Sequence, residues 1–124
     1  MTAHSYRYFD PHGVLAKLHG DQTALMQLTQ AYLRELPAQV NQLQPEFALQ
    51  NVPALRATLH QIRATFGMFD ARRGSALERW IIGRLDDGYA PTAEDLHGLI
   101  CEMLGLSWEL RLFLRQSAAN DGKA

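Results

Sequence analysis

The sequence predicts an all-α protein: an antiparallel up-and-down four-helix bundle with an additional short N-terminal helix. Long segments carry apolar residues at alternating spacings of three and four, as amphipathic helices do. No segment alternates apolar and polar residues in the manner of a half-buried strand. Short segments rich in capping and turn residues separate the helical segments, and short connections favour antiparallel neighbours.

The chain of 124 residues has the size of a single domain. We expect an N-terminal arm over residues 1–9, the helical bundle over residues 10–117 and a disordered tail over residues 118–124. The aromatic residues of the arm are expected to fold back onto the bundle. The tail is polar and built of small residues, which is typical of a disordered chain end.

The first two predicted helices begin at aspartates. Asp10, followed by a proline at the first helical position, is an N-cap for a short helix that reaches about residue 18 and ends at a glycine. Asp21 caps the second helix, whose apolar stripe continues to about residue 49. Pro37 lies inside this stripe and predicts a kink near residues 34–36, with two separate helices as the alternative. Pro45 allows the last turn to be a separate piece.

The remaining three helices also carry start signals. Asn51, with a proline in the following turn, caps a helix that ends near Asp70. A fourth helix is expected over about residues 71–85, and Asp70 is a candidate cap for it. Thr92 and Asp95 resemble a capping box at the start of a fifth helix, expected over about residues 93–116.

The third helix carries the most informative histidine of the chain. Its core-facing seam is spaced 4, 3, 4, 3 and consists of Leu55, Leu59, Ile62, Phe66 and Phe69. At about 100° per residue, the seam centres roughly 140° from His60, so this imidazole is expected to face solvent. Six small or cationic residues fall within about 60° of it, namely Arg56, Ala57, Arg63, Ala64, Gly67 and Ala71. This arrangement suits an anion on, or arriving at, the histidine.

The region around this histidine is locally basic although the whole chain carries a formal charge of −1. Residues 51–84 contain six arginines against two carboxylates, a local charge of +4 with histidines neutral. An ordinary solvated arginine face is the alternative interpretation. The near-neutral total gives no bias toward nucleic acid, so we expect no nucleic-acid partner.

His60-x-Ile62-Arg63-Ala64, with Gly67 one turn further on, resembles the phosphoacceptor motif of histidine phosphotransfer (HPt) domains. That motif is a histidine, any residue, an aliphatic residue, Lys or Arg, then Gly or Ala. The upstream segments that resemble the same family are Phe9-Asp10-Pro11, Leu15 to Asp21, Leu25-Met26 and Tyr32-Leu33. The similarity spans roughly residues 8–80.

Three residues depart from the family pattern. Thr65 and Phe66 stand where small residues are common, and Asp70 stands where many members carry a second glycine. A carboxylate at this last position either weakens docking of an acidic partner or caps the next helix.

The resemblance implies a phosphocarrier of a two-component phosphorelay rather than an enzyme with its own ATP site. His60 would accept a phosphoryl group from a receiver-domain aspartate, such as that of a hybrid sensor histidine kinase, and pass it to another response-regulator receiver. The residues expected to neutralise phosphate or assist docking are Arg63, Arg56, Gln61, Ala64 and Gly67. No cofactor is expected on this chain, because Mg²⁺ would belong to the partner receiver domain.

The alternative function is a helical interaction module that binds a receiver or a kinase without being phosphorylated, and the three departures keep it open. A third hypothesis, metal or small-ligand binding, depends on His97 and Cys101, which have the i, i+4 spacing of metal ligands. No second pair completes such a site, so no metal is expected and Cys101 is expected to be buried. Trp80 and Trp108 are expected to be packing aromatics.

Composition indicates where the chain works. No run of 18 apolar residues exists, so no membrane span is predicted, and the N-terminus lacks an apolar signal core. A single cysteine excludes an internal disulfide and fits a reducing compartment. We therefore expect a cytoplasmic monomer, either free-standing or a module of a longer chain.

Overall fold

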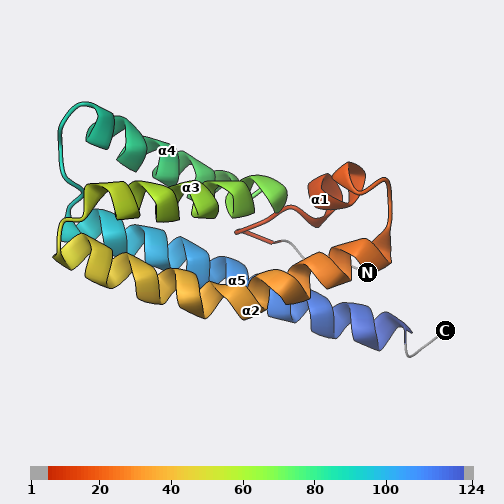
Figure 1. Ribbon diagram of the computed structural model, residues 1–124. Helices are drawn as coiled ribbons and strands as arrows, with labels where there is room; N and C mark the ends of the chain where they lie inside the picture. Colours follow the sequence, from red (N-terminus) through yellow and green to blue (C-terminus); the bar gives the residue numbers. More distant parts are fainter. Residues whose placement is uncertain (1–5, 122–124) are drawn as a thin grey trace.

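The computed structural model describes residues 6–121, which form five helices and no strand (Figure 1). The helices are α1 (Pro11–Lys17), α2 (Gln22–Ala48), α3 (Val52–Met68), α4 (Arg72–Asp86) and α5 (Ala93–Asp121). The four long helices contact one another in a ring, from α2 through α3 and α4 to α5 and back to α2, while α1 contacts α2. The predicted all-α class is confirmed, and the helices pack as a bundle.

The predicted caps start four of the five helices. The side chains of Asp10, Asp21 and Asn51 each accept a hydrogen bond from a backbone N–H two or three residues further on, at 3.0–3.3 Å. Thr92 and Asp95 form a reciprocal pair at the start of α5. The Thr92 hydroxyl accepts from the Asp95 N–H at 3.1 Å, and the Asp95 carboxylate accepts from the Thr92 N–H at 2.9 Å. Each of these bonds satisfies an N–H that the helix itself leaves unpaired.

Asp70 does not cap α4, so that interpretation is wrong. The residue before α4 is Ala71, and no side chain caps it. Asp70 instead ends α3 in the left-handed conformation, with φ 53°, and its carboxylate lies 3.6 Å from Arg72. The Ala71 N–H donates to the Phe66 carbonyl at 2.8 Å and the Asp70 N–H to the Gly67 carbonyl at 3.3 Å, which is a Schellman motif. This conformation favours glycine, the residue that the resemblance places here.

Helix α2 continues through both of its internal prolines, so the two-helix alternative at Pro37 and the separate last turn at Pro45 are wrong. A proline inside a helix costs about 3 kcal/mol because it removes a donor and crowds the preceding turn. Leu36 and Leu43 are buried on either side of Pro37, whose own ring is exposed. Burial of this continuous stripe against α3 and α5 offsets the cost.

The ends of the described chain differ in part from expectation. Helix α5 continues through residues 118–121, which the sequence assigned to a disordered tail. Two of these four residues are alanines, the strongest helix formers, which favours continuation of the helix. Residues 1–5 of the predicted arm and residues 122–124 of the predicted tail lie outside the described part.

The described residues of the arm, 6–9, fold back onto the bundle as predicted. The Glu109 carboxylate on α5 accepts the backbone N–H groups of Arg7 and Tyr8, both at 2.7 Å. Phe9 is buried, and its ring lies edge-on to those of Phe69 and Phe113, with centroids 6.4 and 5.9 Å away. These contacts anchor residues 7–9 against the end of the bundle at which α3 finishes.

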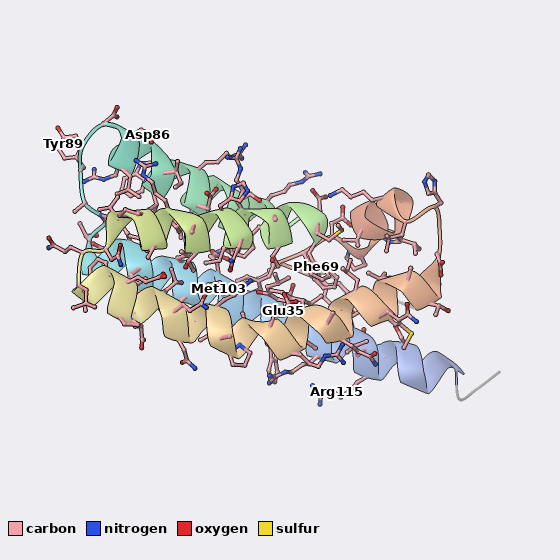
Figure 2. All side chains as sticks on the ribbon, in the orientation of Figure 1. Glu35, Phe69, Asp86, Tyr89, Met103 and Arg115 are labelled. Carbon is pink, nitrogen blue, oxygen red and sulfur yellow. The ribbon has the colours of Figure 1, made fainter. Side chains whose placement is uncertain are left out.

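The core lies among the four long helices, and Figure 2 shows Met103 and Phe69 between them. All five residues of the predicted α3 seam are buried. Three expectations about single residues are wrong, because Trp80 and Trp108 are 50% and 62% exposed and Cys101 is also exposed. No helix within residues 6–121 has the length and hydropathy that a membrane crossing needs.

Candidate functional site

His60 lies on the exposed side of α3, as the sequence predicts. Its neighbours in the chain explain why. Leu59 and Ile62, one residue before it and two after it, are both buried in the core. Because successive residues turn by about 100°, burial of these two side chains turns the imidazole outward. The ring is therefore open to a partner.

Four of the six arginines in residues 51–84 are already engaged. Three of them form ion pairs: Arg56 with Asp86 at 2.8 Å, Arg72 with Asp70 at 3.6 Å and Arg73 with Glu102 at 3.1 Å. The fourth, Arg84, stacks on two rings, with its guanidinium carbon 4.9 Å from the centroid of Trp80 and 5.1 Å from that of Tyr89. Arg63 and Arg79 are exposed and form no ion pair with any described residue. The local basicity seen in the sequence thus reduces to two cations with free binding capacity.

Glu78 on α4 places a buried carboxylate beside these groups. Its side chain is 1% exposed, and its Oε2 has no hydrogen-bond partner in the described structure. Burial raises the pKa of the Glu78 carboxyl, while the charges of Arg63, Arg79 and His60 act in the opposite direction and lower it. The charges of His60, Arg63 and Arg79 thus all act on one buried acid, which lies on the neighbouring helix α4.

Sequence reasoning missed both Glu78 and Arg79. A usable signal existed for Glu78, which lies three residues before Ile81 and four after Gly74, at the spacing of the buried stripe of α4. An acid on a buried stripe is a candidate for a special role, because an unpaired buried charge is costly. No comparable signal distinguishes Arg79 from the other arginines of the segment.

Three more predicted residues, Gln61, Ala64 and Gly67, are exposed beside His60 on α3. A Cβ atom added to Gly67 would meet nothing within 4 Å, so packing inside the chain does not require glycine there. Gly74 on α4 differs, since a Cβ there would lie 2.8 Å from the Phe66 ring. The Gly67 carbonyl accepts a hydrogen bond from the Lys17 ammonium of α1 at 2.5 Å, which adds a cation at the end of this surface.

The two bulky departures from the family motif do not screen His60. Phe66 is buried in the core and packs on Gly74. Thr65 is about 140° around the helix from His60, and its hydroxyl donates to the Gln61 carbonyl at 3.2 Å. We define the His60 face as His60, Arg63, Ala64, Gly67 and Arg79. It combines an exposed nucleophile, two unpaired cations and two residues without bulk, a set that can accept a phosphoryl group delivered from outside.

The second candidate cluster is smaller. The Cys101 sulfur lies 3.5 Å from His97 Nε2, so the two side chains are in contact as their spacing predicts. Residues 6–121 contain no group of three or more His, Cys, Asp or Glu side chains that could hold a metal ion. The two residues lie one turn apart on α5, and two ligands alone do not indicate a metal centre.

Comparisons of the chain with protein-family models, with curated proteins and with solved structures return no match. The HPt resemblance therefore depends on the motif residues and their helical frame.

Proposed function

We propose that the protein is a histidine phosphocarrier of a two-component phosphorelay, with His60 as the residue that is phosphorylated. The observation that carries the proposal is an exposed imidazole on the same face as Arg63 and Arg79, the two arginines of residues 51–84 that form no ion pair and no ring stack with any described residue. The proposal includes an antiparallel up-and-down arrangement of the four long helices with α1 as the additional short helix. The ring of contacts among α2, α3, α4 and α5 supports it.

The transfer step needs little from this chain beyond a nucleophile and positive charge. The ring nitrogen of His60 that carries the lone pair forms the N–P bond while the P–O bond to the receiver aspartate breaks. The electron pair leaves with the receiver carboxylate, and the proton on the other ring nitrogen remains there. Arg63 and Arg79 neutralise the phosphoryl oxygens, and the receiver supplies Mg²⁺. The same step in the opposite direction loads the next receiver.

The other residues of the site have supporting roles in this proposal. Ala64 and Gly67 let the receiver surface approach the helix closely. Glu78 is a positioning residue, whose buried charge holds Arg63 and Arg79 toward His60. Arg56 contributes less, because its guanidinium is already paired with Asp86. Gln61 is exposed next to His60 and is available for a hydrogen bond to phosphate.

The test is phosphotransfer from a phosphorylated receiver domain to the full chain. Wild type should acquire a label that is labile in acid and stable in alkali, and His60→Gln should acquire none. His97→Gln removes another exposed helical histidine and should be labelled like wild type. All three proteins should have the same helical content, and their free energies of unfolding should agree within about 0.5 kcal/mol, because both histidines are on the surface.

Retained labelling of a folded His60→Gln protein would overturn the proposal. Tight receiver binding without any label on wild type would instead support the interaction module. Burial of Phe66 and the lateral position of Thr65 weaken that alternative, because neither side chain covers the imidazole. Asp70 is half-buried and carries a charge, and it is then the next residue to change.

A further inference from the structure

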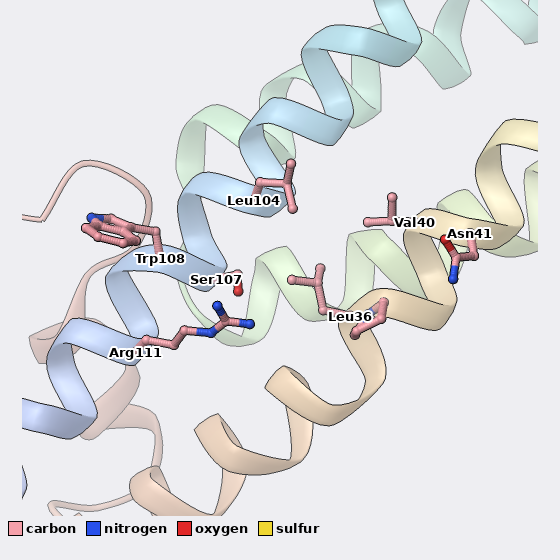
Figure 3. A pocket seen from close by; sticks show the side chains of 8 residues that line it. Leu36, Val40, Asn41, Leu104, Ser107, Trp108 and Arg111 are labelled. Atoms are coloured by element: carbon pink, nitrogen blue, oxygen red, sulfur yellow. The ribbon is translucent and has the colours of Figure 1, made fainter.

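A second surface of the bundle is a groove between α2 and α5. It has a volume of about 280 Å³, and its outer lining includes Pro37, Val40 and Asn41 from α2 and Leu104, Trp108 and Arg111 from α5 (Figure 3). We call this surface the α2–α5 groove. In the ring of helix contacts α2 and α5 are neighbours, whereas His60 belongs to α3 and couples to α4. The groove is therefore separate from the His60 face.

The groove exposes large apolar side chains that internal packing does not use. Trp108 is 62% exposed and Leu104 is 52% exposed, one turn apart on α5. Figure 3 shows the Leu104 side chain directed toward Val40 across the groove. Contiguous exposed apolar surface on a small helical domain marks an interaction site, and Trp and Arg are the residues most enriched where binding energy concentrates.

The charged residue that lines the groove is a cation, Arg111. Arg111 is exposed, forms no ion pair with any described residue and extends its guanidinium toward α2 in Figure 3. Arg115 follows on the same stripe of α5, and Arg34 precedes Pro37 by three residues on α2. None of the lining residues is acidic. The nearest acids of α5, Glu102 and Glu109, are engaged elsewhere, with Arg73 and with the N-terminal arm.

Positive charge at the groove favours an acidic binding partner. A second copy of the chain docked symmetrically through the same groove would bring its Arg111 against a surface that already carries an arginine and no acid, which is unfavourable. A stripe from Leu104 to Arg115 spans about 16 Å, or three helical turns, which matches the ridge of one further helix. We propose that the α2–α5 groove binds an acidic amphipathic helix of a partner protein. Apolar side chains of that helix pack on Leu104 and Trp108, and its carboxylates pair with Arg111.

The test selects peptides from a display library of amphipathic helices whose polar positions vary freely among acidic, neutral and basic residues. The bait is the full-length protein, with the Trp108→Ala protein for counter-selection. Enriched peptides should combine apolar anchors at helical spacing with Asp or Glu within one turn of them. For a synthetic peptide of the enriched sequence, Trp108→Ala should raise the dissociation constant by about 30-fold, the effect of losing a central interface tryptophan. Arg111→Glu should abolish the preference for acidic over basic versions of the peptide.

Two controls keep the outcome clear. Trp80→Ala removes a tryptophan of similar exposure from α4 and should leave the dissociation constant unchanged, as should His60→Gln. Enrichment of basic peptides, or no enrichment over the Trp108→Ala protein, would overturn the proposal. Sedimentation equilibrium provides a further check, since a dimer that Trp108→Ala dissociates would show that a second copy fills the groove. Because His60 takes no part, these outcomes do not depend on phosphotransfer.

Discussion

The His60 face and the α2–α5 groove are two surfaces of one bundle that each present unpaired arginines, yet their surroundings differ. Around His60 the exposed neighbours are alanine and glycine, and an acid is buried beneath them. Around Arg111 the neighbours are leucine, valine, proline and tryptophan, and no acid lines the surface. The arginines of the first surface lie beside a nucleophile, whereas those of the second border apolar area.

If both proposals hold, the size of the neighbouring side chains decides what an exposed arginine can do. In the proposed transfer, small neighbours would let a receiver bring a phosphoryl group close to the backbone of α3, where the cations would neutralise it. Large apolar neighbours exclude water and supply contact area, so that the cation selects among partners that bury the same area.

Removing the free cations of the His60 face should have the largest effect on transfer. Arg63→Ala and Arg79→Ala should each lower the rate of phosphotransfer by about 10- to 100-fold, because each removes a charge-assisted hydrogen bond worth about 1.5–3 kcal/mol. The measurement is the initial rate of labelling at fixed receiver concentration. Arg72→Ala removes an exposed arginine of α4 that is already paired with Asp70 and should change the rate little. An equal loss in all three variants would indicate a general charge effect rather than a defined site.

Substitution of the two buried acids should have opposite effects on stability. Burial raises the pKa of Glu78 above its ordinary value of 4.5, so the folded chain holds this proton more tightly than the unfolded chain. The stability associated with protonated Glu78 is therefore complete below pH 4.5 and is lost as the pH rises through the raised pKa. Glu78→Gln should remove this loss and be more stable than wild type at pH 7. Chemical denaturation between pH 4 and pH 8 measures the difference.

The matched variant is Glu109→Gln. The Glu109 carboxylate accepts two backbone N–H groups of the arm, one on each oxygen. An amide in its place offers one neutral oxygen to the first N–H and turns an NH2 donor toward the second, which then has no acceptor. We expect a destabilisation of about 1–2 kcal/mol. A destabilised Glu78→Gln protein would contradict the assignment of Glu78 as an unsatisfied buried acid. A slower transfer rate in a stabilised Glu78→Gln protein would separate its positioning role from its structural one.

The smallest expected effect concerns the glycine of the His60 face. Gly67→Ala should stabilise the fold by about 0.5–1 kcal/mol, because alanine is the better helix former and the added methyl group meets nothing within the chain. The same substitution should slow transfer, because the methyl group stands between helix α3 and the receiver. Gly83→Ala on α4 has the same free space and should give the stability gain alone. A transfer rate unaffected by Gly67→Ala would remove the close-approach role of this residue.

Local sequence signals predicted most of the fold. The caps at Asp10, Asp21, Asn51 and Thr92 and the seam of α3 are short-range features, since each depends on residues within a few positions of one another. The exposure of His60 followed from the same periodicity. Expectations were wrong where a longer-range balance decided the outcome. Helix α2 continues past Pro37 because burial against α3 and α5 offsets the lost hydrogen bond.

Which residues make up the His60 face and the α2–α5 groove depends on how the helices pack against one another. Helical periodicity alone predicted an exposed histidine among arginines. It could not tell which arginines form ion pairs, because the acids that pair with Arg56 and Arg73 lie 30 and 29 residues further along the chain. Nor could it show that Trp108 stays outside the core. Periodicity reports which side of a helix is apolar, whereas ion pairing, burial of Glu78 and the groove depend on which helices become neighbours.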